Sequence, residues 1–243
     1  MNLHSFLHLV DTEREVLTAK DRMPGSLLNP PNRWNIYRAA SDTYRLRIPD
    51  NAPGGLYFPR IGLYKYESMN RMTITTKDGI EIGDAIDLIP IKVVNNKHVA
   101  PANAVNAQFA EIATLIGFDI VPERAEFRPG DTIDLTLYYR SKQLTRIGYT
   151  RFAHLFADGL GMAAQSDSQP QEGGNPTSSW IPGEVIVDRV KLMLDPNAEP
   201  GTYLLSAGFY APDAPGTRLP AFDSSGVSQP NQQIFLRSVE IVR

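Results

Sequence analysis

Apolar and polar residues alternate along several stretches of the chain, which is the pattern of strands with one buried face. The clearest case is Ile133, Leu135, Leu137 and Tyr139, which alternate with Asp, Thr and Tyr residues after a Pro-Gly-Asp turn. Similar stretches lie at residues 57–63, 152–157, 185–194, 203–209 and 232–242. Short strands joined by turns, without a long amphipathic helix in the sequence, predict an all-β protein of the immunoglobulin-like or fibronectin-like sandwich type.

Residues 106–118 fit two structures, because their apolar residues could line one side of a helix or belong to a bent strand. We expect a strand, on the resemblance described below. The residues just before this segment are polar and include proline, as in linkers. The boundary between two modules is therefore expected near residue 100, with module one at residues 1–100 and module two at residues 101–243.

The chain contains an internal repeat. Residues 6–64 align with residues 152–210 at a constant shift of 146 without a gap, and about 16 of roughly 59 positions are identical. Many of the identical residues are turn-forming or aromatic, and such residues fix backbone shape. We therefore expect two copies of one module. The matched pairs include Phe6/Phe152, His8/His154, Asp21/Asp167, Trp34/Trp180, Asp42/Asp188, Gly62/Gly208 and Tyr64/Tyr210.

The two copies begin at different points of the module. Module two has predicted strands near residues 108–121 and 131–139 ahead of Phe152, whereas module one starts almost at the equivalent Phe6. A sandwich without its opening strands exposes backbone and apolar surface. We therefore expect the first module to lack these strands. We also expect the chain to be a fragment of a longer protein, or the gap to be filled by residues from elsewhere.

Composition narrows the function classes. Of the 243 residues, 42% are hydrophobic and 21% are charged, and the net charge is −3 without any basic run. Binding to a phosphate backbone needs a basic patch, so nucleic acid is not expected as a partner. The chain has no cysteine, which removes disulfides and thiolate chemistry. The histidines and carboxylates lack metal-ligand spacing and no nucleophile motif is present, so we expect no metal, no cofactor and no catalysis.

Two aspartates fall on the apolar side of predicted strands. Asp188 shares a face with isoleucine, valine and leucine residues in 185–194, and Asp42 repeats this position in module one. A carboxylate that faces a core needs a charged or hydrogen-bonding partner. The expected partners are His154 and His8, or backbone N–H groups of the loop that contains the tryptophan. We interpret these four polar residues as structural, with ligand or metal binding as the alternative.

Four aromatic residues are the candidates for ligand binding. Trp34 and Trp180 precede turns, where an exposed indole could stack on a sugar ring, but each could instead close one end of the core. Tyr64 and Tyr210 are expected on the outward faces of their strands. The tyrosines could line a binding surface or simply cover the sheet.

Several segments of module two resemble one known family. These segments are FRPGDTIDLTLYY at 127–139, FAHL at 152–155, QSDSQP at 165–170, PTSSWIPGE at 176–184, and PGTY at 200–203 followed by GFY at 208–210. Together they are similar to the β-sandwich region that follows the membrane-spanning part of certain bacterial polyprenyl-phosphate-dependent glycosyltransferases. The resemblance covers nearly all of module two and, in diluted form, module one. The membrane helices and catalytic acidic residues of that family have no counterpart in this chain.

This resemblance implies a non-catalytic accessory module outside the cytoplasm, with a glycan, a lipid-linked sugar or a membrane-embedded parent region as partner. The alternative is a structural spacer or a protein-interaction module without a small-molecule ligand. The two hypotheses differ in surface chemistry. An exposed Trp180 or Tyr210 beside polar groups favours sugar binding, whereas a buried tryptophan under a featureless surface favours the spacer.

Overall fold

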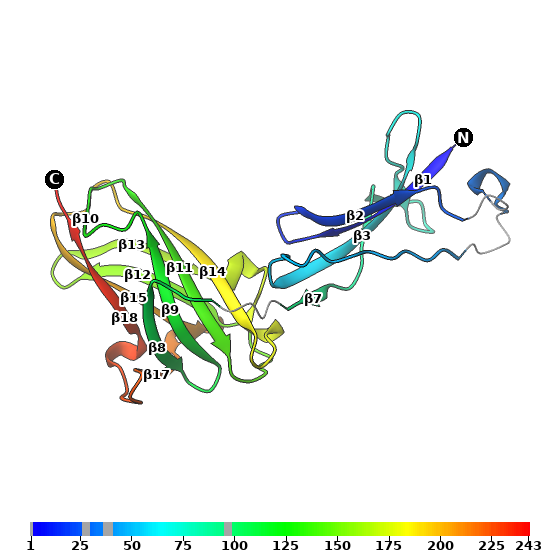
Figure 1. Cartoon of the computed structure of the whole chain (residues 1–243). Coiled ribbons are helices and arrows are strands. Elements are labelled where there is room, and N and C mark those ends of the chain that lie inside the picture. Colours follow the sequence, from blue (N-terminus) through cyan, green and yellow to red (C-terminus); the bar gives the residue numbers. More distant parts are fainter. Residues whose placement is uncertain (1, 26–29, 36–40, 95–98) are drawn as a thin grey trace. The chain divides into compact units, whose positions relative to one another are not determined.

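The computed structural model describes residues 2–25, 30–35, 41–94 and 99–243 (Figure 1). The chain divides into two compact units, Met1–Val93 and Val94–Arg243. The division lies a few residues before the boundary expected near residue 100, and part of the predicted linker, residues 95–98, lies outside the described residues. Within the described ranges the longer elements are all strands, which confirms the all-β class, and no helix is long and apolar enough to cross a membrane.

Unit 2 is a sandwich of two sheets. The first, here called the β15 sheet, has the order β10-β18-β15-β12-β13, with β16 also paired to β15. The second, the β11 sheet, has the order β14-β11-β9-β8-β17. The strands of the β15 sheet are β10 (Glu126–Phe127), β12 (Thr150–Ala157), β13 (Gly161–Ser168), β15 (Gly201–Ala211), β16 (Ala214–Arg218) and β18 (Ile234–Ile241). Those of the β11 sheet are β8 (Asn103–Phe109), β9 (Ala113–Val121), β11 (Thr132–Ser141), β14 (Val185–Met193) and β17 (Ala221–Phe222).

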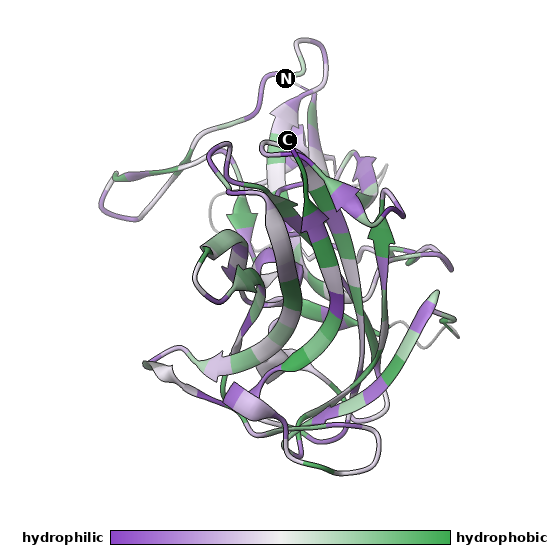
Figure 2. Ribbon diagram, turned by 90° about the vertical axis from the view of Figure 1, so that its left-hand side faces the viewer, coloured by the Kyte–Doolittle hydropathy of each residue, from purple (hydrophilic) through white to green (hydrophobic). Residues whose placement is uncertain are grey.

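The core of unit 2 lies between these sheets and follows the period-two pattern of the sequence. Each sheet turns one set of alternating side chains inward, and hydrophobic and hydrophilic positions alternate along the strands in Figure 2. The two inward rows belong to one continuous buried cluster, so burial of apolar surface holds the sheets together. The rows are Ile133, Leu135, Leu137 and Tyr139 of β11 and Tyr203, Leu205, Ala207 and Phe209 of β15.

Residues 106–118 form strands, as expected, although two strands replace the predicted single bent one. β8 ends at Phe109 and β9 begins at Ala113, and the two pair antiparallel. The turn between them uses Ala110 with a φ of 45°. Apolar residues on both sides of a tight turn produce the spacing of a helical stripe, which explains the ambiguity in the sequence.

Unit 1 is a single five-stranded sheet with a separate hairpin. Its sheet has the order β2-β1-β3-β6, with β7 also paired to β3, and β4 pairs only with β5. Among the residues that the structure describes, unit 1 has no counterpart of β8, β9 and β11 and is therefore not a closed sandwich. Its strands are β1 (Leu3–Val10), β2 (Val16–Arg22), β3 (Gly55–Lys65), β4 (Ile74–Thr75), β5 (Glu81–Gly83), β6 (Ile86–Asp87) and β7 (Ile91–Val93).

The internal repeat is visible strand by strand. At a shift of 146, β1, β2 and β3 correspond to β12, β13 and β15, and the bounds of β3 coincide with those of β15. The short 3-10 helix η1 (Pro31–Arg33) likewise coincides with η3 (Thr177–Ser179). The segment equivalent to β14 forms no strand in residues 41–49, because β14 pairs with β11 and the described part of unit 1 has no counterpart of β11.

The repeat continues beyond the stretch that the sequence comparison detects. β6 and β7 pair with β3 as β18 pairs with β15, now at a shift of 148. Ile61 faces Ile86 in unit 1, for example, where Ala207 faces Ile234 in unit 2. Pro90 takes the place of Ser238, and since proline cannot donate a ladder hydrogen bond, one long strand becomes two short pieces. Unit 1 thus repeats most of the β15 sheet.

Candidate functional site

A stack of three residues lies on the outer face of the β15 sheet, away from the core. Phe152 points outward from β12, yet it is fully buried because it packs on Gly208 below and under Arg218 above. The Arg218 guanidinium carbon lies 4.4 Å from the centre of the Phe152 ring. A side chain at Gly208 would clash with the ring, since a Cβ built there overlaps Phe152 Cζ.

A hydrogen-bonded triad lies beside this stack. His154 Nε2 lies 2.8 Å from Asp167 Oδ1, and the Tyr210 hydroxyl donates to Asp167 Oδ2 at 3.1 Å. Burial and the nearby Asp167 carboxylate raise the pKa of Tyr210, which favours the protonated hydroxyl that donates this hydrogen bond. Tyr210 thus lies on the outer face of the β15 sheet, and its hydroxyl is hydrogen-bonded to Asp167 of the same sheet.

Unit 1 repeats both arrangements. Arg71 lies 4.6 Å above the Phe6 ring, and the ring packs against Gly62. His8 Nε2 lies 2.9 Å from Asp21 Oδ1. Burial followed by the Asp21 carboxylate raises the pKa of Tyr64, the counterpart of Tyr210, and the Tyr64 hydroxyl lies 3.5 Å from His4 Nδ1. Because the stack and triad occur in both units, we interpret them as the framework of the repeated sheet.

Asp188 faces the core as expected, whereas Asp42 is an exposed residue outside any strand, and both pair with an arginine and not with the expected histidines. Asp188 lies inside unit 2 and pairs with Arg151 Nε at 3.0 Å. Its other oxygen accepts the backbone N–H of Gln171 at 2.7 Å, from the loop that also contains Trp180. His154 cannot reach it, because His154 projects from the outer face of β12 whereas Arg151 projects from the inner face. Burial raises the pKa of Asp188, and the Arg151 guanidinium opposes this shift.

Asp42 makes the equivalent contacts in unit 1. Arg22 Nη2 lies 2.5 Å from Asp42 Oδ1, and Asp42 Oδ2 accepts the backbone N–H of Gly25 at 3.1 Å. Gly25 and Gln171 stand at matching positions of the repeat. Each aspartate therefore ties a loop to its unit, and His8 is not its partner.

The tryptophans do not form a matched pair of ligand platforms. Trp180 is only 1% exposed, its Nε1 donates to the Asn175 carbonyl at 2.8 Å, and its ring packs near Tyr139 and Phe209. It closes one end of the core, and a sugar cannot stack on it. Trp34 follows η1 and is 37% exposed, since the β11 strand that covers its counterpart has no equivalent in the described part of unit 1.

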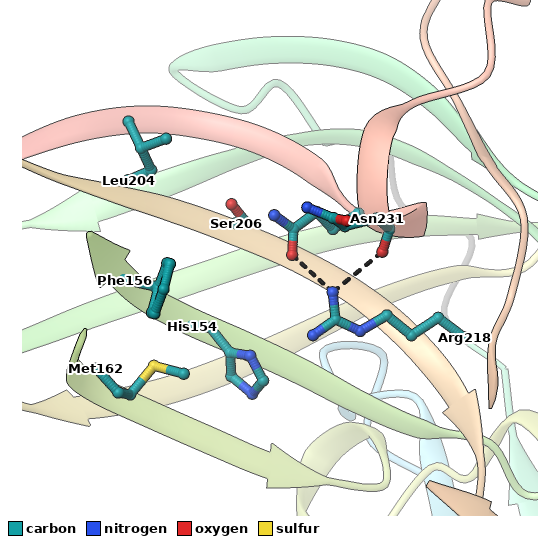
Figure 3. Close-up of a pocket in the computed structure, with 8 residues that line it drawn as sticks. His154, Phe156, Met162, Leu204, Ser206, Arg218 and Asn231 are labelled. Atoms are coloured by element: carbon teal, nitrogen blue, oxygen red, sulfur yellow. Dashed lines mark hydrogen bonds between the residues drawn. The ribbon is translucent and has the colours of Figure 1, made fainter. Parts of the chain in front are cut away.

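A groove of about 510 Å³ lies next to the framework stack of unit 2 (Figure 3). Its apolar wall is one row across three strands, because Phe156 of β12 is paired with Met162 of β13 on one side and Leu204 of β15 on the other. These side chains are 43%, 41% and 48% exposed, respectively. Exposed apolar residues in a contiguous row, beside polar groups, are typical of binding surfaces.

Polar groups line the rest of the groove. His154 and Ser206 are directly paired in the neighbouring row of the sheet. Arg218 enters from the end of β16, where its Nη1 donates to the Asn231 carbonyl at 3.0 Å and to Gln233 Oε1 at 2.9 Å. Figure 3 shows His154 and the Arg218 guanidinium pointing toward one another across β15. The groove thus combines an apolar wall with several hydrogen-bonding groups.

The equivalent surface of unit 1 has different chemistry. Arg60 replaces Ser206, and it pairs with Asp87 at 3.1 Å and with Asp84 at 3.6 Å. Arg14 also pairs with Asp87, at 2.6 Å. In this network the charges of two arginines are neutralised by two aspartates. The same position of unit 2 has a small serine next to an apolar wall. Within the described residues, the comparison separates the shared framework from the groove, which is found in unit 2 and is therefore the candidate site.

Sequence reasoning missed the wall of the groove. Phe156, Met162 and Leu204 each look like isolated surface residues, and only strand pairing brings them together. Tyr210 is a predicted ligand-binding candidate, and His154 is predicted to be structural with ligand binding as the alternative; the structure places His154 at the groove and Tyr210 in the adjoining triad. Among the described residues no group of three or more His, Asp or Glu side chains lies close enough together to hold a metal ion.

Comparison with known proteins gives neither a matching family model nor a curated protein of similar sequence.

Proposed function

We propose that this chain is a non-catalytic binding module that holds a sugar in the groove of unit 2. The observation that carries the proposal is the exposed row of Phe156, Met162 and Leu204 beside hydrogen-bonding side chains. A pyranose has an apolar C–H face and a polar rim, so this combination suits it. At about 510 Å³ the groove is large enough for one or a few sugar rings.

The setting of this activity rests on the sequence resemblance. A β-sandwich similar to the accessory region of bacterial polyprenyl-phosphate-dependent glycosyltransferases would act outside the cytoplasm, near a glycan or lipid-linked sugar. The proposed binding residues lie on the outer face of the β15 sheet and differ from the predicted Trp34, Trp180, Tyr64 and Tyr210. Trp180 is buried, and the hydroxyl of Tyr210 is hydrogen-bonded to Asp167.

A glycan array followed by titration calorimetry tests the proposal. We expect binding to a restricted set of sugars, and a loss of about tenfold in affinity in Phe156→Ala, since the variant removes the aromatic part of the wall. Met162→Ala should also weaken binding. Met193→Ala is its matched control, because Met193 is a 68% exposed methionine on the other sheet. Equal effects of Met162→Ala and Met193→Ala, or the absence of binding to any sugar, would contradict the proposal.

Unit 1 supports a second candidate function, protein interaction. Six of its large apolar side chains are more than 40% exposed within a stretch of twelve residues, and Ile89 reaches 87%. Apolar exposure on this scale marks contact surfaces. The six residues are Ile80, Ile82, Ile86, Leu88, Ile89 and Ile91. Sedimentation velocity tests the simplest form, association between copies: we expect concentration-dependent association that Ile89→Lys weakens, and a concentration-independent monomer would contradict it.

A further inference from the structure

Arg218 pairs with no carboxylate among the described residues, whereas its counterpart Arg71 pairs with Asp84. In unit 1, Arg71 lies over Phe6 and pairs with Asp84 Oδ2 at 3.3 Å. In unit 2, the shift of 148 places Gln232 where Asp84 stands, and the backbone oxygens of both residues lie against the matching glycines, Gly62 and Gly208. Unit 2 therefore has a neutral amide where unit 1 has an acid, while both units have the arginine.

The contacts of Arg218 leave its charge without an acidic partner. Its Nη1 donates to a carbonyl and to a side-chain amide, both neutral, and none of the described carboxylates forms an ion pair with it. The nearest acid of the triad, Asp167, is already engaged by His154 and Tyr210. Arginine presents a planar fork of donors that suits carboxylate and phosphate groups.

The guanidinium of Arg218 is held in place at the edge of the groove. Stacking on Phe152 and two hydrogen bonds through Nη1 hold its plane, and no described residue accepts a hydrogen bond from Nη2 or Nε. Arg218 lines the groove at the polar side, across from the apolar wall. A held, half-buried cation at the edge of a groove is prepared for an anion, because little conformational freedom is lost on binding.

We propose that the groove takes an anionic sugar, with its carboxylate or phosphate on Arg218 and its apolar face on Phe156 and Met162. This inference rests on the proposed sugar-binding function and names the chemical class of the ligand. Both kinds of anion accept two hydrogen bonds from one guanidinium, so the same geometry serves either source.

Calorimetric titrations of the full chain with glucose, glucuronate and glucose 1-phosphate test the proposal. We expect at least one acidic sugar to bind about tenfold or more tightly than glucose, because hydrogen bonds to charged groups are the stronger ones. This preference should weaken as salt rises. Preference for glucuronate would identify a carboxylate ligand, and preference for glucose 1-phosphate a phosphate ligand.

Variants separate the role of Arg218 from a general effect on the fold. Arg218→Gln should abolish the preference for the acidic sugar, and Arg218→Lys, which keeps the charge, should retain part of it. Arg71→Gln is the matched control, because it changes the equivalent stack of unit 1, and it should leave the preference unchanged. Thermal unfolding of each variant checks that unit 2 is folded.

The outcomes distinguish this inference from the function on which it rests. Glucose binding as tightly as both acidic sugars would overturn the anionic ligand and leave sugar binding intact. An acidic preference that persists in Arg218→Gln would also overturn the inference, because the anion would then bind elsewhere. Failure of all three sugars to bind, with no hit on the glycan array, would overturn both proposals.

Discussion

Arg151 and Asp188 form an ion pair at 3.0 Å, and neither side chain is accessible to solvent. The strand pairing shows that the two units supply the arginine that pairs with the aspartate from different strands. Arg151 of β12 faces Ser168 of β13, whereas at the matching positions of unit 1 Ser5 faces Arg22. Arginine and serine have exchanged strands, and each unit keeps one arginine against its aspartate.

This exchange predicts a rescue. Arg151→Ser should destabilise unit 2 by about 3–5 kcal/mol, because it leaves a buried carboxylate without its cation. The double variant Arg151→Ser/Ser168→Arg recreates the arrangement of unit 1 and should recover part of that loss. Urea unfolding in a Trp34→Phe background measures it, since the remaining fluorescence then comes from Trp180 in the core of unit 2.

The matched control for this prediction is Arg22→Ser in unit 1. The Arg22–Asp42 pair is partly exposed, at 32% and 21% for the two side chains, so its loss should cost about 1 kcal/mol or less. A double variant of unit 2 that is no more stable than Arg151→Ser would contradict the idea that the two units use interchangeable arrangements.

Two buried tyrosines should respond in opposite ways to removal of the hydroxyl. The Tyr139 hydroxyl is buried and meets no hydrogen-bond partner within the described ranges, whereas the Tyr203 hydroxyl donates to the Glu199 carbonyl at 3.0 Å. Tyr139→Phe should therefore be neutral or stabilise unit 2, while Tyr203→Phe should cost about 1 kcal/mol. Urea midpoints of the two variants, with unchanged slopes, decide the matter, and equal losses would contradict the assignment.

The burial of Tyr139 also leads us to expect that unit 2 loses stability at alkaline pH. Complete burial raises the pKa of Tyr139 above its ordinary value of 10, so the folded state keeps the proton that the unfolded state releases. The stability linked to this group is intact below about pH 10 and falls as pH rises above that value. Thermal unfolding of the wild type and Tyr139→Phe from pH 8 to 11 should show a smaller decline in the variant, and parallel declines would argue against it.

The stack of Phe152 on Gly208 predicts that Gly208 cannot be replaced by a residue with a side chain without loss of stability. Gly208→Ala would bring Cβ into the Phe152 ring and should destabilise unit 2 by about 1–3 kcal/mol. Gly216→Ala is the control, because a Cβ there meets no heavy atom within 4 Å among the described residues. Equal stability of the two variants in urea would show that the stack tolerates an added methyl group.

Much of the fold could be predicted because its signals are local. The alternation in residues 132–141 and 201–211 marks half-buried strands, and both are observed. The repeat was detectable because aromatic and turn residues stand at one constant shift. Its continuation to β6 and β7 was hidden because the shift changes to 148. Strand β13 gave little signal, because it is an edge strand of mostly small and polar residues.

Of the partners predicted for Asp188, the backbone N–H of the loop that contains Trp180 is confirmed, whereas His154 is wrong because partners depend on strand faces as well as on strand order. His154 lies on the right strand but points to the opposite side. A usable signal was present, since Arg151 alternates with the buried Ala153 and Leu155 and therefore shares their inward face. The groove gave no such signal, because its wall depends on the register of three strands, and register is a tertiary property.

Nuclear magnetic resonance of methyl-labelled methionine tests the central claim most directly. The chain has six methionines, of which unit 2 holds Met162 in the groove and Met193 on the opposite sheet. Titration with the sugars that bind should shift the Met162 methyl resonance in a saturable way and leave that of Met193 and those of unit 1 in place. A saturable shift at Met193 or at a methionine of unit 1, with Met162 unchanged, would contradict a binding site on the outer face of the β15 sheet.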